Sequence, residues 1–151
     1  MLTYYRGTFG ERRALGAYIK LLRAADSVRV RAMAHLAASG LTPSQFGALE
    51  ILLHRGPLCQ KEIAAKLLVS GGNITMVIDN LEKRGLVERR RNRDDRRYIT
   101  VALTAAGRHL ISRIFPRHVV RVVEEMGLLS PAEQDLLGSL CRRLGKKEGK
   151  R

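Results

Sequence analysis

Six arginines and two aspartates fall within the nine residues from Arg89 to Arg97. Guanidinium groups pair with phosphate and fit the narrow minor groove of DNA, so this run could supply contacts to a nucleic acid. Asp94 and Asp95 would hold neighbouring guanidinium groups in position. A charged run by itself is usually a solvated surface, so its meaning depends on the elements around it.

A second polar set lies just upstream, between Ser70 and Lys83, on a segment with helical periodicity. Its inner face carries Ile74, Val77, Ile78 and Leu81. A helix of this size fits a major groove about 12 Å wide, and the glycines after Ser70 would let a phosphate approach the backbone. The DNA contacts that we expect are Ser70, Gly72, Asn73, Thr75, Met76, Asn80, Lys83, Arg91, Arg93, Arg96 and Arg97, with Asp95 positioning the arginines of the run.

The net charge supports a polyanionic partner. Twenty-eight Lys and Arg stand against fourteen Asp and Glu, which gives +14 over 151 residues. Nucleic acid is the first candidate for that partner and an anionic membrane surface is the second. No apolar run is long enough to span a bilayer, and the N-terminus does not resemble a signal peptide, so we expect a cytoplasmic protein.

The order of elements predicts a mainly α fold with a small β-hairpin wing. We expect a single domain over residues 1–151, with a winged helix-turn-helix lobe over 42–104. Long amphipathic helices over 11–38 and 105–145 should flank this lobe. Strands are predicted from Leu86 to about Arg90 and from Tyr98 to Leu103.

Local signals define several helix ends. Thr42 and Ser130 each begin a capping box and are each followed by proline, and Gly85 suits the left-handed residue that ends a helix. Ser70 is the expected N-cap of the helix that carries the polar set, and Pro116 is expected to kink a long helix.

The flanking helices carry more apolar surface than a small core can cover, so we expect a homodimer. The residues expected at its interface are Leu15, Tyr18, Ile19, Leu136, Leu137, Leu140 and Leu144.

Three stretches resemble the MarR family of winged-helix transcription regulators: residues 41–46, residues 80–87, and residues 95–97 leading to Leu103, Thr104 and Gly107. The resemblance implies a dimer built from the first and last helices, with the fourth helix in the major groove and the wing in the minor groove. Arg97 matches the family's groove-entering arginine, and Asp95 matches its acidic partner. Residues 70–75 and 114–118 are most similar to a branch that senses quinones and related phenols.

The resemblance also implies a small-molecule effector. Family members bind aromatic anions between the dimer helices and the DNA-binding lobe, or they oxidise a cysteine. The expected pocket residues are Tyr18, Leu22, Phe46, His54 and Phe115. Leu22, Phe46 and Phe115 could instead be ordinary core residues, and His54 could be a surface or phosphate contact.

Cys59 stands at the predicted N-cap of the third helix, where the family more often has serine or threonine. Thiolate is favoured at a helix N-terminus, which makes Cys59 a candidate redox residue. The alternative is that Cys59 and Cys141 are small apolar residues in a reducing compartment.

No catalytic constellation, metal-ligand spacing or phosphate loop occurs, so we expect no enzyme activity, no cofactor and no metal. The predicted function is sequence-specific binding of double-stranded DNA at an inverted-repeat operator, as a repressor released by an aromatic or quinone effector. Two alternatives stay open: a nucleoid-type architectural protein and a winged-helix module for protein–protein contact.

Overall fold

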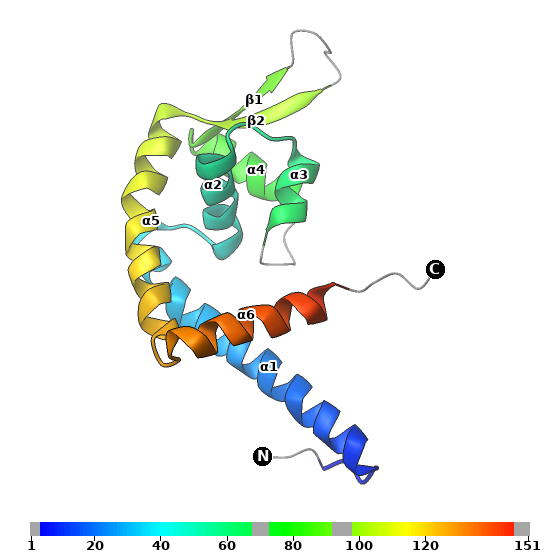
Figure 1. The fold of residues 1–151 in the computed structure, drawn as a ribbon. Coiled ribbons are helices and arrows are strands. Elements are labelled where there is room, and N and C mark those ends of the chain that lie inside the picture. The colour runs from blue at the N-terminus through cyan, green and yellow to red at the C-terminus, as the bar shows by residue number, and fades with distance from the viewer. Residues whose placement is uncertain (1–3, 68–72, 92–97, 147–151) are drawn as a thin grey trace. The chain divides into compact units, whose positions relative to one another are not determined.

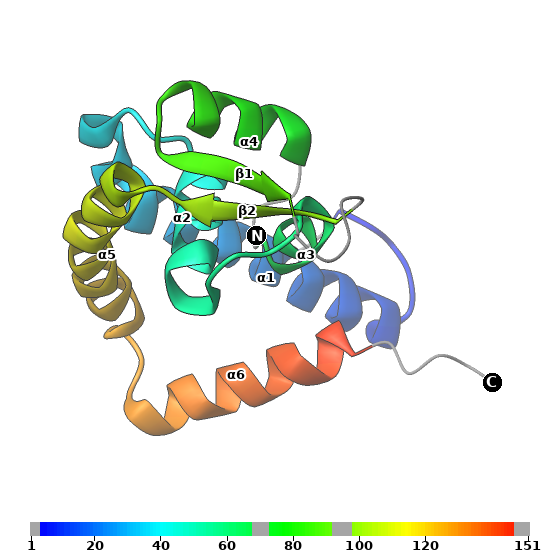
Figure 2. The same cartoon turned by 90° about the horizontal axis from the view of Figure 1, so that it is seen from above.

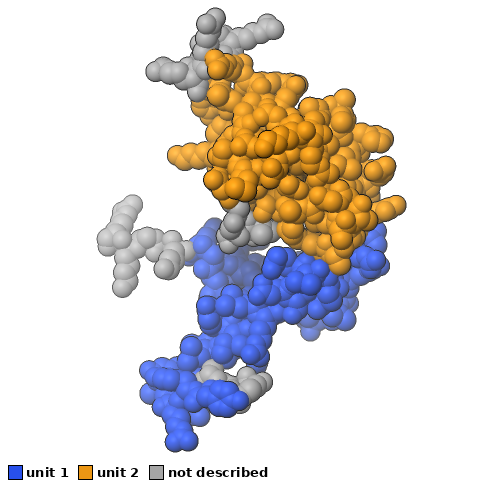
Figure 3. All heavy atoms as spheres, turned by 180° about the vertical axis from the view of Figure 1, so that it is seen from behind, with its two compact units in different colours: residues 1–32, 120–151 blue, residues 33–119 orange. Residues whose placement is uncertain are grey.

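The computed structural model describes residues 4–67, 73–91 and 98–146. The elements along the chain (Figure 1) are α1 (Phe9–Met33), the 3₁₀ helix η1 (Ala34–Ser39), α2 (Pro43–Arg55), α3 (Gln60–Lys66), α4 (Ile74–Lys83), β1 (Val87–Arg91), β2 (Ile99–Leu103), α5 (Ala105–Met126) and α6 (Pro131–Gly145). The chain divides into two compact units, coloured separately in Figure 3. Unit 1 comprises residues 1–32 and 120–151, and unit 2 comprises residues 33–119.

Unit 2 is built around one apolar core. Helices α2, α3, α4 and α5 each contribute side chains that are completely buried, among them Phe46, Ile63, Ile78 and Ile111, each 0% exposed. Burial of one large apolar side chain contributes about 1.5–3 kcal/mol. The apolar stripe of α4 therefore fixes which of its faces points outward.

A two-stranded antiparallel sheet completes unit 2. Its register runs from Val87 opposite Leu103 to Arg91 opposite Ile99. Leu58, in the connection between α2 and α3, pairs with Val101 through reciprocal backbone hydrogen bonds of 3.1 and 2.8 Å. In Figure 2, which looks down on unit 2, α4 lies along β1, and α2 and α3 are joined below β2. The predicted mainly α fold with a β-hairpin is confirmed.

Two glycines set the junctions around the hairpin. Gly85 follows α4 with a φ of 67°, the left-handed conformation predicted for it. Gly107, in the first turn of α5, lies against the backbone of Leu86, and a Cβ atom there would meet the Leu86 carbonyl oxygen at 1.8 Å. Helix α5 can approach the start of β1 this closely only because residue 107 has no side chain.

The predicted capping boxes of α2 and α6 are confirmed. The Thr42 backbone N–H donates to Gln45 Oε1 at 3.1 Å, and the Gln45 N–H donates to Thr42 Oγ1 at 3.2 Å. At α6 the Ser130 N–H donates to Glu133 Oε2 at 2.8 Å. This carboxylate accepts the backbone hydrogen bond in its charged form, which lowers the pKa of Glu133 below its usual value.

Four predicted boundaries were wrong. The helix expected over 11–38 stops at Met33 and continues as the 3₁₀ helix η1, which ends at Gly40 with a φ of 64°. Helix α4 begins at Ile74 and its N-cap is Asn73, not Ser70, because the Asn73 side chain accepts the Thr75 N–H at 3.0 Å. Strands β1 and β2 begin one residue later than expected. Pro116 lies inside α5, and the helix continues on both sides of it.

Unit 1 contains α1 up to Ala32, the last turns of α5, and the whole of α6. Much apolar surface remains exposed on these helices. Arg31 Nε of α1 donates to Glu125 Oε2 of α5 at 2.7 Å, which ties these helices together. Helix α6 has no buried residue anywhere between Pro131 and Gly145, a range that the structure describes in full. Among the described residues, no helix has both the length and the apolar character needed to cross a lipid bilayer.

Candidate nucleic-acid interface and pocket

Helix α4 presents the polar face that its sequence predicted. Val77, Ile78 and Leu81 are buried in the core of unit 2. The opposite side exposes the expected contact residues Asn73, Thr75, Met76, Asn80 and Lys83, and Met76 is 61% exposed. An exposed thioether of this size on an otherwise polar face would be available to an apolar group of a partner.

Arg91 is exposed at the end of β1, where the strand leads into the charged run. The other expected contacts, and the acidic residue expected to position the arginines, lie outside the described residues: Ser70, Gly72, Arg93, Asp95, Arg96 and Arg97.

The Thr75 side chain is held from the neighbouring helix α3. Gln60 Nε2 donates to Thr75 Oγ1 at 3.2 Å. Because this bond uses the hydroxyl only as an acceptor, the Thr75 O–H remains a donor for a partner. The same Gln60 accepts two hydrogen bonds through its Oε1 from the Arg89 guanidinium, at 3.1 and 3.0 Å.

Arg89 connects three elements at the base of the hairpin. Its Nη2 donates to Asp79 Oδ1 of α4 at 2.5 Å, and its Nη1 pairs with the Glu82 carboxylate of the same helix. Its backbone N–H also donates to Glu82 Oε1, at 3.0 Å. The pKa of Arg89 is raised, chiefly by the hydrogen bond to Asp79 and also by the hydrogen bond and charge of Glu82. Partial burial of the guanidinium acts in the opposite direction. We call Gln60, Asp79, Glu82 and Arg89 the Arg89 cluster.

The Arg89 cluster changes the interpretation of the charged run. The sequence grouped Arg89 with the outward-facing arginines, whereas its side chain is only 26% exposed and bonded to α3 and α4. Strand alternation was the signal that could have found this, because Arg89 shares a strand face with the buried Val87. Arg90 faces the other way and pairs with the exposed Glu88 at 2.5 Å.

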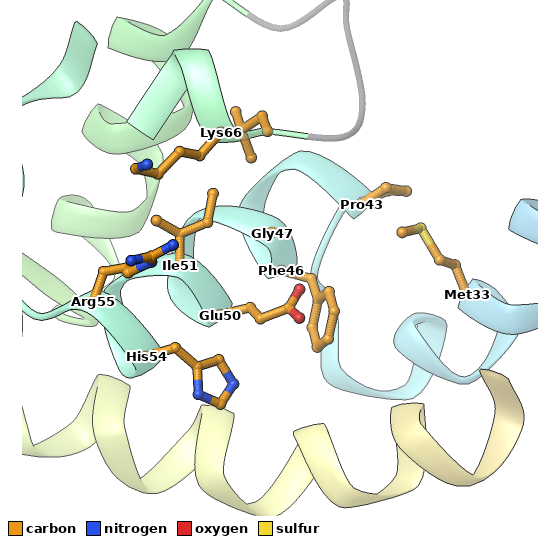
Figure 4. Close-up of a pocket in the computed structure, with 10 residues that line it drawn as sticks. Met33, Pro43, Phe46, Gly47, Glu50, Ile51, His54, Arg55 and Lys66 are labelled. Atoms are coloured by element: carbon orange, nitrogen blue, oxygen red, sulfur yellow. The ribbon is translucent and has the colours of Figure 1, made fainter. Parts of the chain in front are cut away.

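A pocket of about 370 Å³ opens beside α2 and the end of α3, within unit 2. Figure 4 shows the Glu50 carboxylate beside the Phe46 ring, and the Arg55 and Lys66 side chains on the other side of Ile51. The residues that line the pocket are Met33, Pro43, Phe46, Gly47, Glu50, Ile51, His54, Arg55, Lys66 and Leu67. The pocket thus combines an apolar wall with cationic groups at one side and a carboxylate at the other.

The expected pocket residues are divided between the two units. Phe46 and His54 line the pocket, and the Phe115 ring contacts His54 at a centroid distance of 4.7 Å. Tyr18 and Leu22 belong to α1 in unit 1, where they are 59% and 46% exposed. Sequence reasoning missed Glu50, Arg55 and Lys66, the groups that give this pocket its polarity.

Cys59 is the N-cap of α3, as predicted. Its backbone N–H donates to Glu62 Oε2 at 2.9 Å, and this bond lowers the pKa of Glu62. Tyr98, at the start of the second hairpin arm, lies next to the Cys59 sulfur, and the negative charge of a thiolate there raises the pKa of the Tyr98 hydroxyl.

Comparisons with known proteins agree with this arrangement. Residues 39–97 match the sequence profile of the MarR family. An uncharacterized HTH-type transcriptional regulator of Bacillus subtilis, YkoM, is 35% identical over 133 residues, which cover 88% of this chain and 86% of YkoM. The HTH-type transcriptional regulator MhqR of the same organism is 33% identical over 133 residues, covering 88% of this chain and 92% of MhqR.

The fold also matches solved structures. One is Bordetella bronchiseptica BpsR, whose DNA binding is regulated by 6-hydroxynicotinic acid; it superposes with a TM-score of 0.78 at 24% identity, covering 95% of this chain and 100% of BpsR. At that identity the likeness shows a shared fold. Together with the similarity to two HTH-type regulators over 88% of this chain, the matched profile establishes that the chain belongs to the MarR family of DNA-binding transcription regulators.

Proposed function

We propose that this chain is a homodimeric repressor that binds an inverted-repeat operator and leaves it when a small hydroxy-aromatic acid occupies the pocket beside α2. The observation that carries the DNA-binding part is the outward face of α4, which is polar while its inner face is buried. A rigidly held helix with such a face is what reading of a major groove requires.

The exposed side chains of α4 suit base edges of different kinds. The Asn80 amide can form a bidentate pair with adenine, and Met76 can contact the methyl group of thymine. Lys83, in the last turn, supplies a cation for guanine or phosphate. Asn73 and Thr75 lie at the N-terminus of the helix, where backbone amides favour an anion. The wing contacts predicted beyond Arg91 belong to the same proposal.

Selection of bound sequences from random duplexes tests this proposal. We expect an inverted repeat with half-sites about 10 base pairs apart. Asn80→Ala should cost about 1–3 kcal/mol in operator binding and relax selectivity at one position of each half-site. Lys146→Gln, at the exposed end of α6, is the control and should leave selectivity unchanged. No enriched sequence, with equal affinity for all duplexes, would favour the architectural alternative.

The dimer proposal rests on the apolar stripe of α6. Four leucines share one side of this helix and are 36–69% exposed: Leu136, Leu137, Leu140 and Leu144. On α1, Leu15 and Tyr18 are 37% and 59% exposed. Exposed apolar stripes on two helices of one unit are typical of a subunit interface.

Leu140→Arg should convert the dimer to a monomer and abolish operator binding, because it places a charge in an apolar interface. Asp135→Arg, on the opposite side of α6, is the matched control and should stay dimeric. Analytical ultracentrifugation of both proteins at micromolar concentration decides the point. A monomeric parent that still protects a symmetric footprint would contradict the dimer.

The pocket suggests the chemistry of the effector. An aromatic ring would pack against Ile51, its carboxylate would meet Arg55 and Lys66, and a hydroxyl at the far side of the ring would donate to Glu50. BpsR, with the same fold, is regulated by a molecule of this class. A quinone lacks both the carboxylate and the hydroxyl donor.

Calorimetric titration of the DNA-free protein with 4-hydroxybenzoate, benzoate and benzoquinone tests these contacts. We expect 4-hydroxybenzoate to bind most tightly and to release operator DNA. Arg55→Gln should weaken its binding by at least about tenfold, which corresponds to about 1.4 kcal/mol. Arg108→Gln, an exposed arginine on α5, is the control. Equal binding to the parent and to Arg55→Gln would rule out the assignment.

A further inference from the structure

We propose that a hollow between η1 and α5 is a second binding site, specific for a phosphate group. The hollow measures about 320 Å³ and lies wholly within unit 2. It shares no lining residue with the pocket beside α2. Its lining consists of His35, Ala38, Ser39, Arg113, Ile114 and Arg117.

Two unneutralised arginines dominate this site. Arg113 and Arg117 lie four residues apart on α5, so their side chains share one face of the helix, where like charges repel. Some helical arginines have acidic partners, such as Arg31 with Glu125 at 2.7 Å and Arg121 with Glu124 at 3.2 Å, whereas other arginines of the described helices form no ion pair. Within the described ranges, Arg113 and Arg117 make no such pair, and no carboxylate lines the hollow.

The floor and the far wall are also free of negative charge. Ile114 is only 7% exposed and forms an apolar floor. The His35 ring lies 5.4 Å from the His118 ring and 6.3 Å from the Phe46 ring, measured between centroids. Among the described residues, the buried Nδ1 atom of His118 has no hydrogen-bond partner. An anion in the hollow would therefore face two guanidinium groups, the His35 side chain and the apolar Ile114.

The η1 wall is anchored from α4. Arg84 Nη1 donates to the Gly40 carbonyl at 2.9 Å, and Arg84 Nη2 donates to the Ser39 carbonyl at 3.2 Å. The Ser39 hydroxyl donates to the Leu36 carbonyl at 2.7 Å, so it closes the end of η1 rather than serving as a donor to the ligand. The donors that line the hollow and remain for the ligand are the guanidinium groups of Arg113 and Arg117.

This donor set favours a phosphate over a carboxylate. Two guanidinium groups from successive turns offer several N–H donors and two positive charges, which match the three oxygens and double charge of a terminal phosphate. The hollow has room for more than one phosphate group. The phosphate could belong to a small phosphorylated molecule or to the DNA backbone, and the two sources require different measurements.

The first measurement uses DNA-free protein and inorganic pyrophosphate in a chloride buffer, followed by calorimetry. We expect saturable binding that weakens by at least about tenfold in the double variant R113Q/R117Q, equivalent to losing one charge-assisted hydrogen bond. The control R108Q/R121Q also removes two positive charges from exposed positions of the same helix, outside the hollow, and should bind within about twofold of the parent. Acetate at equal concentration should not compete.

The second measurement is the salt dependence of operator binding. If the ligand is a backbone phosphate, R113Q/R117Q should lower the salt slope by about two units and the control should not. Either a selective loss of pyrophosphate binding or a selective fall in salt slope supports the site. If both double variants behave alike in both measurements, or if acetate competes as well as pyrophosphate, the proposal is overturned. The first measurement needs no operator, so its outcome is independent of the proposed repressor function.

Discussion

Replacement of Arg89 by methionine tests whether this residue positions α4 or contacts DNA. The substitution keeps a long apolar stem and removes the guanidinium that joins Gln60, Asp79 and Glu82. Asp79 and Glu82 then remain as neighbouring carboxylates on α4 without their shared cation. We therefore expect both a loss of stability and a displaced α4.

The expected loss of stability in Arg89→Met can be worked out from the exposure of Asp79 and Glu82. The Asp79 and Glu82 side chains are 45% and 39% exposed, so each ion pair contributes only about 0.2–1 kcal/mol after screening by solvent. The hydrogen bonds to Gln60 add about 1 kcal/mol. The sum is about 2 kcal/mol, which should lower the urea midpoint by about 1 M. Arg90→Met, which breaks only the exposed pair with Glu88, should cost less than about 1 kcal/mol.

DNA binding separates the two roles of Arg89 more sharply. If Arg89 only positions α4, then Arg89→Met reduces operator affinity more than affinity for random duplex, and the salt slope stays that of the parent. If Arg89 contacts a phosphate, binding to all sequences weakens alike and the slope falls by about one unit. Fluorescence anisotropy at several salt concentrations, with folded protein verified by circular dichroism, measures both quantities. A uniform loss with a reduced slope would refute the positioning role.

Three further predictions concern single residues. Gly107→Ala should destabilise unit 2 by at least about 1–3 kcal/mol in urea unfolding, because the new methyl group would collide with the Leu86 carbonyl; an unchanged midpoint would show that α5 does not pack there as described. Glu133 has a lowered pKa in the folded protein, so its capping contribution is fully present above its ordinary pKa of 4.5 and is lost as the pH falls through the lower folded value. The stability of the parent should consequently fall more steeply on acidification than that of Glu133→Gln, and parallel curves would contradict this. Peroxide or benzoquinone should release DNA from the parent but not from Cys59→Ser, which keeps an N-cap; equal release from both would leave Cys59 a cap alone.

Local chemistry in the sequence was sufficient to predict most elements and the polar outward face of α4. Capping boxes at Thr42 and Ser130 and the left-handed glycine after α4 depend on residues within four positions of one another, so their signals can be read along the chain. The polar face of α4 follows from the helical repeat of its apolar residues. The mainly α fold with a β-hairpin could be predicted from the order of these local signals, whereas the MarR-family resemblance came from three matching stretches of sequence.

Only the tertiary structure decided which partners the charged groups meet. Strand alternation places Arg89 and Arg90 on opposite faces of β1, but Gln60 is 29 positions away from Arg89, and only the packing of β1 against α3 and α4 brings the two together. The polar groups of the pocket beside α2 come from two helices, since Glu50 and Arg55 belong to α2 and Lys66 belongs to α3. The hollow of Arg113 and Arg117 likewise depends on η1 lying against α5, because a sequence shows which charges exist but not which of them lack a partner.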